Sequence, residues 1–200
     1  MARIKRAERE QTLTNTRRLL LDAAAGELAH DGYAVANINR ISEAAGFAKG
    51  TVYNYFPSKR ALMMALIDDI AAAHLEAIAG PVRAETDARL RLERFFEAGF
   101  AWVERSPAPA QVMIVTLNSP DAEFRQTMYA AYQPMFALVR QDIVEAGVEQ
   151  GVFRPVDLLD TTALLMTLYL GTCSQVDERG KPWLAPGKVS GFAFDALRPR

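Results

Sequence analysis

The feature that most limits the fold of this sequence is the spacing of its apolar residues. They recur at i, i+3, i+4 and i+7 along most of the chain, and almost no stretch alternates with a period of two. The first spacing puts apolar side chains on one face of an α-helix, and the second would put them on one face of a strand. With 200 residues, half of them apolar, the chain can bury a substantial core. The sequence therefore predicts an all-α protein.

Residues that favour the ends of helices divide this pattern into segments. Asn37 and Ser58 are good N-caps, and Gly32 fits the left-handed residue that follows a helix. Pro107 and Pro120 each follow a serine, an arrangement that is typical of a helix entry. The helices expected from these signals span residues 12–30, 38–45, 48–55, 59–80, 87–105, 107–118, 121–150, 156–176 and 186–197.

Charge is distributed unevenly along the chain. Residues 1–60 carry ten Lys and Arg against six Asp and Glu, whereas residues 61–200 carry thirteen against eighteen. An excess of positive charge at one end favours contact with a polyanion such as nucleic acid. A solvated surface is the alternative.

Cysteine and histidine usage argues against a disulfide framework and a metal site. Cys173 is the only cysteine, and it shows no metal-ligand spacing with His30 or His74. We therefore expect no cofactor and no metal. The longest apolar run, residues 163–170, is shorter than the roughly 20 residues of a membrane span, and no export signal begins the chain. A cytoplasmic protein is expected.

The stretch GFAKGTVYNYFPSK, residues 46–59, is unusually dense in rings, cations and glycines. A short helix is expected before Gly46 and another after it, which is the spacing of a helix-turn-helix whose second helix enters the major groove of DNA. Val52 and Phe56 lie four residues apart and are expected to point into the core. The polar and aromatic residues between them provide hydroxyls for phosphates and donors for base edges.

Two further features of this stretch fit a nucleic-acid partner. Gly50 inside a short helix costs about 1 kcal/mol relative to alanine, which close approach of its backbone to a partner would explain. Lys59 and Arg60 lie in the first turn of the next helix, where the macrodipole disfavours cations. A DNA phosphate would satisfy both side chains and the free amides of that turn. Two charges that simply point to water are the alternative.

The stretch DGYAVANINRISEAAGFAKGTVYNYFPSKRALMMAL resembles the N-terminal signature of the tetracycline-repressor (TetR) family of bacterial transcriptional regulators, in register from about Leu20 to Leu66. The resemblance implies a three-helix DNA-binding domain over residues 1–57. A helical effector-binding and dimerisation domain would follow over residues 58–200, with about nine helices in all. The resemblance and the capping pattern together assign the following residues to DNA binding: Asn37, Lys49, Gly50, Thr51, Tyr53, Asn54, Tyr55 and Lys59.

Three positions depart from the pattern that is usual in this family. Asn37 stands where threonine is common, Ser42 where alanine is common, and Ala48 where serine or threonine is common. Asn37 still provides an N-cap, but Ala48 removes a cap and a phosphate ligand. We therefore expect the recognition helix to start less firmly.

Four basic residues precede the first expected helix. They are Arg3, Lys5, Arg6 and Arg9. They form either an arm that follows the DNA backbone or minor groove, or a disordered solubilising tail.

The expected helix at residues 156–176 is apolar on two faces. One face carries Leu158, Thr162, Leu165, Tyr169 and Cys173, and the other carries Leu159, Ala163, Met166 and Leu170. One face can serve the core and the other a partner, so that this helix and the one at residues 186–197 build a four-helix interface between two subunits. An internal four-helix core within one chain is the alternative.

Aromatic and methionine side chains gather on the helices of the larger half. Pro134 falls within the long expected helix, where it removes a backbone hydrogen bond and kinks or breaks the helix. A bent helix leaves room, so we expect a largely apolar cavity of about 300 Å³ or more for a hydrophobic or aromatic effector. Plain core packing is the alternative. The residues expected to bind the effector are Phe96, Phe100, Met113, Met128, Tyr132, Phe136, Met166 and Tyr169.

These features predict a ligand-responsive repressor that binds a palindromic DNA operator as a homodimer and is released by a small hydrophobic effector. The helix that begins at Lys59 is expected to link the effector domain to the DNA. A helical small-molecule-binding or scaffold protein that no longer binds DNA is the alternative. An enzyme is not expected, because the sequence has no phosphate-binding loop, no Ser-His-Asp set and no metal-ligand spacing.

Overall fold

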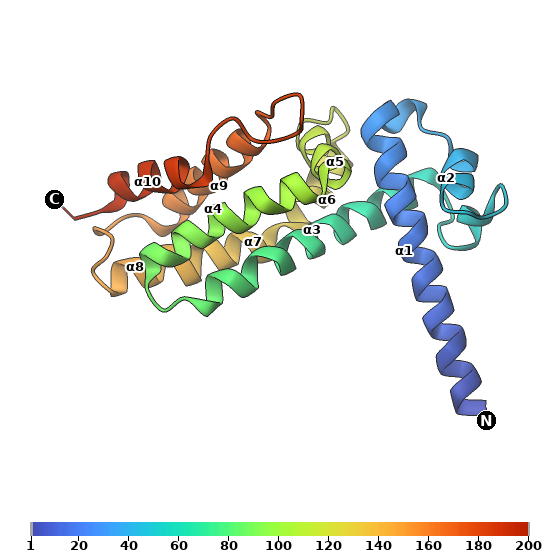
Figure 1. Ribbon diagram of the computed structural model, residues 1–200, viewed down its shortest axis with the longest axis horizontal. Helices are drawn as coiled ribbons and strands as arrows, with labels where there is room; N and C mark the ends of the chain where they lie inside the picture. Colours follow the sequence, from blue (N-terminus) through green and yellow to red (C-terminus); the bar gives the residue numbers. More distant parts are fainter. Residues whose placement is uncertain (1, 200) are drawn as a thin grey trace.

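The computed structural model describes residues 2–199, and the side chains of residues 11–199. Over this range the chain is helical apart from its connections and one isolated bridge between Val176 and Pro182, which confirms the predicted all-α class. No helix in this range is long and apolar enough to cross a membrane. The elements in Figure 1 are α1 (Ala2–Val35), α2 (Ile38–Ala44), η1 (Thr51–Asn54), α3 (Lys59–Ala84), α4 (Ala88–Arg105), α5 (Pro107–Leu117), α6 (Ala122–Ala131), α7 (Gln133–Leu138), η2 (Val139–Glu145), α8 (Ala146–Glu149), α9 (Leu158–Cys173) and α10 (Pro186–Leu197).

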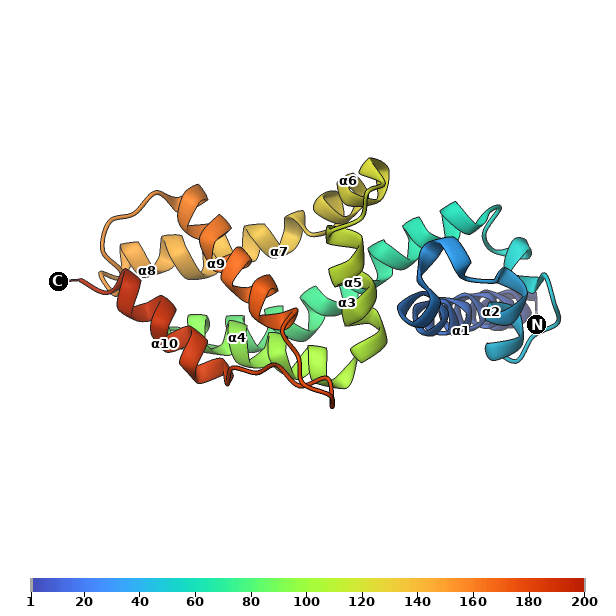
Figure 2. The same cartoon turned by 90° about the horizontal axis from the view of Figure 1, so that it is seen from above.

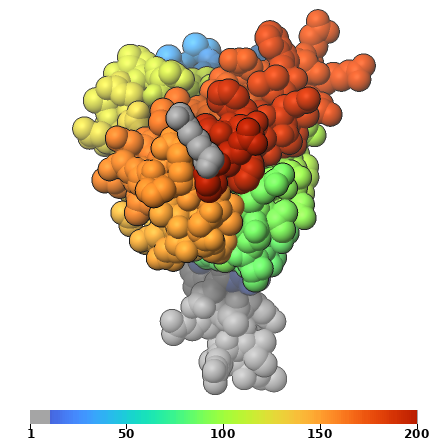
Figure 3. All heavy atoms as spheres, turned by 90° about the vertical axis from the view of Figure 1, so that its left-hand side faces the viewer, coloured from blue at the N-terminus to red at the C-terminus, as the bar shows by residue number. Residues whose placement is uncertain are grey.

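The elements form two parts, which we call the head and the body. The head consists of α1, α2 and η1, and the body consists of α3 to α10. Figures 1 and 2 show α3 running from the head along the length of the body, while α5 lies where the body meets α1. Figure 3 shows the end of the body remote from the head, where α10 packs beside α4. The head is therefore joined to the body through α3 and through the contact of α1 with α5.

The first helix is longer than the predicted span of residues 12–30, because α1 extends from Ala2 to Val35. Its buried stripe is the predicted one: Leu20, Leu21, Ala24 and Leu28. At Gly32 the backbone has φ 73° and ψ 166°, a conformation that is open essentially to glycine alone. Gly32 therefore ends the straight part of the helix, and a last turn follows the kink.

The recognition element is not the α-helix predicted over residues 48–55. It is a single 3₁₀ turn, Thr51–Asn54, that no side chain caps. Gly50 precedes it at φ 79°, and a Cβ added there would meet no atom within 4 Å. The glycine is therefore needed for its left-handed backbone conformation. The prediction that it sits inside a helix was wrong, whereas close approach of a partner to its backbone stays a prediction.

The helix predicted over residues 121–150 is divided into α6, α7, η2 and α8. It breaks at Tyr132, where the backbone has φ −88° and ψ −2°, and Pro134 lies in the first turn of α7. The following segment, η2, is π-helical. The break that Pro134 predicted is confirmed, and Tyr132 marks the joint.

The helix α3 connects the two parts of the molecule. Ser58 caps its start, as predicted, by accepting a hydrogen bond of 3.0 Å from an amide of the first turn. The helix continues through Pro81 to Ala84, beyond the predicted end. Ile78 and Val82 are fully buried on either side of the proline, so packing maintains the helix where the proline removes a hydrogen bond.

Candidate functional site

The head has a well-packed core. Val52 and Phe56 are buried, as predicted, together with Leu20 of α1 and Ile41 of α2. Ser42 is also fully buried, and its Oγ accepts a hydrogen bond of 3.3 Å from the amide of Val52. This bond joins α2 directly to η1. The serine that departs from the family pattern thus ties the two elements of the helix-turn-helix together.

The opposite side of η1 faces solvent. Lys49, Tyr53 and Asn54 are exposed, and Tyr53 shows 54% of its surface. Thr51 and Tyr55 are half-buried beside them. An ammonium, a phenol and an amide are therefore displayed together, which are groups that contact phosphates and base edges. We call Lys49, Tyr53 and Asn54 the exposed face of the head.

Two of the predicted DNA-binding side chains already have partners within the head. Asn37 caps α2, because its Oδ1 accepts a hydrogen bond of 2.9 Å from the amide of Asn39. Lys49 Nζ lies 3.4 Å from Glu43 Oε1, and both side chains are largely exposed. An exposed ion pair of this kind breaks at little cost, so Lys49 can exchange its carboxylate for a phosphate. The basic residues of the predicted arm have side chains outside the described residues: Arg3, Lys5, Arg6 and Arg9.

Lys59 begins α3, as predicted, but its side chain is folded back on the head. Nζ donates a hydrogen bond of 3.2 Å to the carbonyl oxygen of Ala34 and lies 5.0 Å from the centre of the Tyr33 ring. An ammonium has three donors, and Ala34 uses one of them. Two donors therefore remain for a phosphate that approaches the first turn of α3.

The prediction that Arg60 awaits an external anion was wrong. Its guanidinium forms hydrogen bonds with Glu123 and, through two nitrogens, with Asp121. These bonds raise the pKa of Arg60, that of Glu123 being the larger cause, and Arg60 lowers the pKa of Asp121. Asp121, rather than Ser119, is the N-cap of α6. The arginine thus ties the start of α3 to the start of α6.

The predicted effector residues gather in one region of the body, and their side chains fill it. Phe136 is half-buried, and the others are buried: Phe96, Phe100, Met113, Met128, Tyr132, Met166 and Tyr169. The rings of Phe96 and Phe100 each lie 6.1 Å from the ring of Tyr169, centre to centre. The space in which we predicted a cavity is therefore occupied by the chain's own rings.

His74 lies at the centre of this region and was missed by the sequence reasoning. It is fully buried, with Nδ1 2.9 Å from the Tyr132 hydroxyl and Nε2 2.6 Å from the Tyr169 hydroxyl. Its ring is stacked on Trp102, with centres 4.1 Å apart. A signal was available, because His74 follows Ile70 by one helical step of four on the buried stripe of α3.

Burial sets the ionisation of this cluster. It lowers the pKa of His74 to about 3 and raises the pKa of Cys173 to about 12. It also raises the pKa of both phenols, Tyr132 and Tyr169. All four groups are therefore neutral near pH 7. The phenol of Tyr169 fits because Gly99 has no side chain, since a Cβ there would lie 2.5 Å from it.

A surface groove of about 420 Å³ opens beside this region. Phe136 and Met166, two of the predicted effector residues, line it together with Ile114 of α5 and Leu170 of α9. The groove therefore reaches the edge of the filled region from outside.

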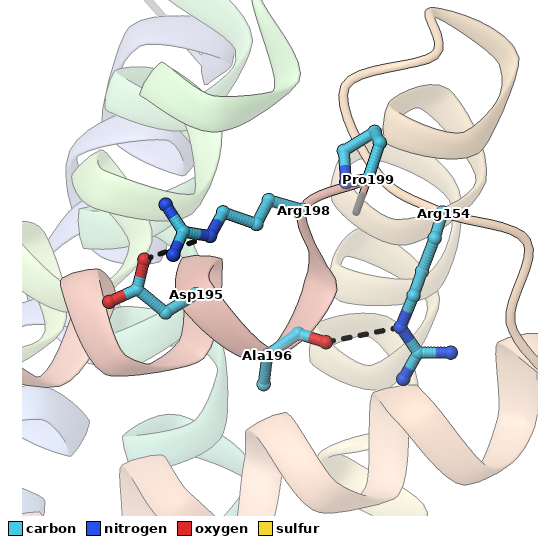
Figure 4. A pocket seen from close by; sticks show the side chains of 5 residues that line it. All are labelled: Arg154, Asp195, Ala196, Arg198 and Pro199. Carbon is cyan, nitrogen blue, oxygen red and sulfur yellow. Dashed lines mark hydrogen bonds and ion pairs between the residues drawn. The ribbon is translucent and has the colours of Figure 1, made fainter.

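A second hollow, of about 540 Å³, lies at the C-terminal end of the body and is shown in Figure 4. There Arg154 Nε donates a hydrogen bond of 3.2 Å to the carbonyl oxygen of Ala196, and Arg198 Nε lies 3.4 Å from Asp195 Oδ1. Both arginines are engaged by the chain itself, and no predicted effector residue lines this hollow. Among the described residues, no group of histidine, cysteine and acidic side chains could hold a metal ion.

The helices α9 and α10 lie along the upper side of the body in Figure 1, and both carry large apolar side chains that are exposed. Leu159, Leu164 and Phe192 expose 66%, 70% and 69% of their surface. One of the two predicted apolar faces of α9 is buried or half-buried: Leu158, Thr162, Leu165, Tyr169 and Cys173. On the other predicted face Leu159 and Ala163 are exposed, Leu170 is half-buried and Met166 is buried.

Known proteins resemble the chain in sequence. The pattern described as "Bacterial regulatory proteins, tetR family" matches residues 20–66. The uncharacterized HTH-type transcriptional regulator YvdT of Bacillus subtilis (strain 168) is 33% identical over 157 residues, which cover 78% of this chain and 79% of that protein. The HTH-type transcriptional repressor KstR2 of Rhodococcus jostii (strain RHA1) is 26% identical over 139 residues, which cover 68% of this chain and 66% of that protein.

Solved structures share the fold. The transcriptional regulator FadR from Bacillus subtilis in complex with stearoyl-CoA has a TM-score of 0.76 at 19% identity, over 90% of this chain and 97% of that one. AibR in complex with isovaleryl coenzyme A and operator DNA has a TM-score of 0.72 at 19% identity, over 92% and 98%. Such identities establish the fold alone. The match over residues 20–66 and the relationship to YvdT lead to one conclusion: the chain belongs to the tetR family of bacterial regulatory proteins.

Proposed function

We propose that this protein is a repressor that binds a palindromic operator as a homodimer and releases it when an effector binds. The observation that carries the proposal is the exposed face of the head, Lys49, Tyr53 and Asn54, which stands on a packed core within the matched family segment. Residues 1–57 form the DNA-binding domain, and residues 58–200 form the effector-binding and dimerisation domain.

The contacts with DNA divide by chemistry. Lys59 and the phenol of Tyr53 bind phosphates, and these contacts position the head without reading sequence. The amide of Asn54 reads a base edge, as asparagine does with adenine. Lys49 leaves Glu43 for a phosphate or a guanine, which its exposed ion pair permits.

The dimer forms through α9 and α10. Leu159, Leu164 and Phe192 are apolar and largely exposed, and a second copy of the same two helices would cover them. The two-fold axis then presents two heads to successive major grooves, about 34–36 Å apart. Light scattering tests this with Leu164→Asp, which should yield a monomer, against Leu90→Asp at an exposed position of α4, which should stay dimeric. A Leu164→Asp variant that stays dimeric places the interface elsewhere.

The effector is an acyl thioester of coenzyme A. Support comes from two regulators of the same fold that were solved with stearoyl-CoA and with isovaleryl coenzyme A. Support also comes from the apolar and aromatic lining of the predicted effector region, which suits an acyl chain. Since side chains fill that region, the acyl chain enters only as they move. An effector that binds only the conformation in which these side chains have moved shifts the equilibrium away from the conformation that binds DNA.

The experiment begins with DNA sites selected from random sequence by the purified protein. Mobility-shift titrations then compare the selected site with a scrambled duplex, and stearoyl-CoA, isovaleryl-CoA and free coenzyme A are added at equal concentrations. We expect preference for the selected site and release by an acyl thioester but not by free coenzyme A. Equal binding to both duplexes contradicts the proposed repressor function. DNA binding that no acyl thioester changes contradicts the proposed effector.

A further inference from the structure

Four buried side chains form a continuous hydrogen-bonded line through the body, which we call the His74 network. In order they are Tyr169, His74, Tyr132 and Met113. The Tyr132 hydroxyl lies 2.8 Å from the sulfur of Met113. His74 joins the two phenols. The network thus links α9, α3, the joint after α6, and α5.

One arrangement of protons satisfies every contact in the network. The sulfur of Met113 carries no hydrogen, so Tyr132 donates to it. The Tyr132 oxygen then accepts from His74 Nδ1–H, and 2.9 Å is the usual length of such a bond. The other ring nitrogen accepts from the Tyr169 hydroxyl at 2.6 Å, a length more typical of an O–H donor.

The weakest hydrogen bond of the network is the one from the Tyr132 hydroxyl to the Met113 sulfur. A thioether sulfur is a weak acceptor, whereas the Tyr132 hydroxyl is a good donor held by His74 and by its place at the end of α6. In a buried site a donor gains most from a strong acceptor. An oxygen acceptor would therefore serve this hydroxyl better than Met113 does. The unbranched methionine side chain can move aside to admit one.

We propose that a carbonyl oxygen of the effector replaces the Met113 sulfur as the acceptor of the Tyr132 hydroxyl, which His74 holds in position. The proposal rests on the proposed function, since an acyl thioester carries one such oxygen at the end of an apolar chain. The surface groove gives the approach, because Ile114 beside Met113 and Met166 on α9 both line it. The recognised class is therefore an apolar chain that ends in a carbonyl group.

The test compares two ligands that differ only at this oxygen. Calorimetry on the full-length protein measures stearoyl-CoA against S-octadecyl-CoA, the thioether in which CH₂ replaces the carbonyl, and isovaleryl-CoA against its thioether. Wild-type protein should prefer the better-binding thioester by about fivefold or more. Tyr132→Phe should abolish this preference and leave affinity for the thioether unchanged. Met113→Leu should increase the preference, because the hydroxyl then lacks an acceptor until the thioester binds.

The two variants give opposite signs, which a purely structural role of the network would not produce. Unchanged affinity for the thioether also shows that the Tyr132→Phe protein keeps its site. A Tyr132→Phe variant that retains the wild-type preference, or that loses affinity equally for both ligands, overturns the inference and leaves the proposed function standing. Failure of both thioesters to bind wild-type protein contradicts the proposed effector, and the inference with it.

Discussion

Arg60 and Asp121 are joined by two hydrogen bonds, of 3.0 and 3.1 Å, between the first turn of α3 and the N-cap of α6. Asp121 also accepts from the amides of Glu123 and Phe124 as the N-cap of α6. One carboxylate therefore fixes the start of α6 and the guanidinium beside Lys59. The other end of α6 meets His74 through Tyr132, so α6 connects the predicted effector region to Arg60, next to Lys59, which we propose contacts DNA.

Replacing Arg60 by glutamine should weaken the response of DNA binding to effector. The variant loses the tie at one end of α6 but keeps the effector region, so the ratio of operator affinities without and with effector should fall by roughly threefold or more. Mobility-shift titrations with and without the acyl thioester measure this ratio. Arg94→Gln is the matched control. Arg94 also pairs with two carboxylates, but these belong to Glu97 of α4 and to Glu85, which lies just before α4. An unchanged ratio in Arg60→Gln would show that α6 does not transmit the response.

Replacing Lys59 by alanine should weaken binding to every DNA sequence by a similar factor. Its ammonium is expected to neutralise one phosphate, so the slope of log affinity against log salt should fall in magnitude by about one. Fluorescence anisotropy at several salt concentrations measures the slope. Lys188→Ala, an exposed lysine of α10, should leave it unchanged. If both variants keep the wild-type slope, Lys59 does not touch a phosphate.

Replacing Gly50 by alanine should lower the free energy of unfolding by about 1 kcal/mol, because alanine disfavours the left-handed conformation at φ 79°. Gly26→Ala is the control, since Gly26 lies in α1 and an added Cβ there also meets nothing within 4 Å. That change should raise the free energy of unfolding by roughly 0.5–1 kcal/mol. Urea unfolding measures both values. Shifts in the same direction would refute the conformational role of Gly50.

His74 should make the protein less stable in mild acid. Its pKa falls from the ordinary 6.5 to about 3 on folding, so between these values the unfolded chain binds a proton that the folded chain does not. The free energy of unfolding should therefore fall with decreasing pH, by about 1.4 kcal/mol per unit from this group alone. His74→Gln should remove this part of the slope. Identical slopes for the two proteins between about pH 4 and pH 6 would contradict it.

Much of the fold follows from local sequence, and the predictions that depend on neighbouring residues agree with the structure. Helical spacing predicts the buried stripe of α1, and capping chemistry predicts the roles of Asn37 and Ser58. Pro134 predicts the break in the long helix because its ring prevents a regular one. These features depend on residues within one or two turns of each other.

The features that sequence reasoning missed depend on distant residues. Arg60 and Asp121 are 61 positions apart, and each looks like an ordinary charge at a helix end until the fold brings them together. His74 occupies a core position that the spacing marks, but nothing local predicts that its partners Tyr132 and Tyr169 lie 58 and 95 positions away. The cavity was predicted from aromatic and methionine side chains beside a helix that Pro134 bends, and neither feature distinguishes an open pocket from packed rings.

The central claim is that the exposed face of the head reads DNA, and an Asn54→Ala variant tests it most directly. Equilibrium binding is measured for wild-type and variant protein on the selected operator and on a scrambled duplex at one salt concentration. We expect Asn54→Ala to lose about fivefold or more on the operator and nothing on the scrambled duplex, since the amide reads a base edge. Equal affinity of the wild-type protein for both duplexes, or the same loss on both in the variant, would contradict the account.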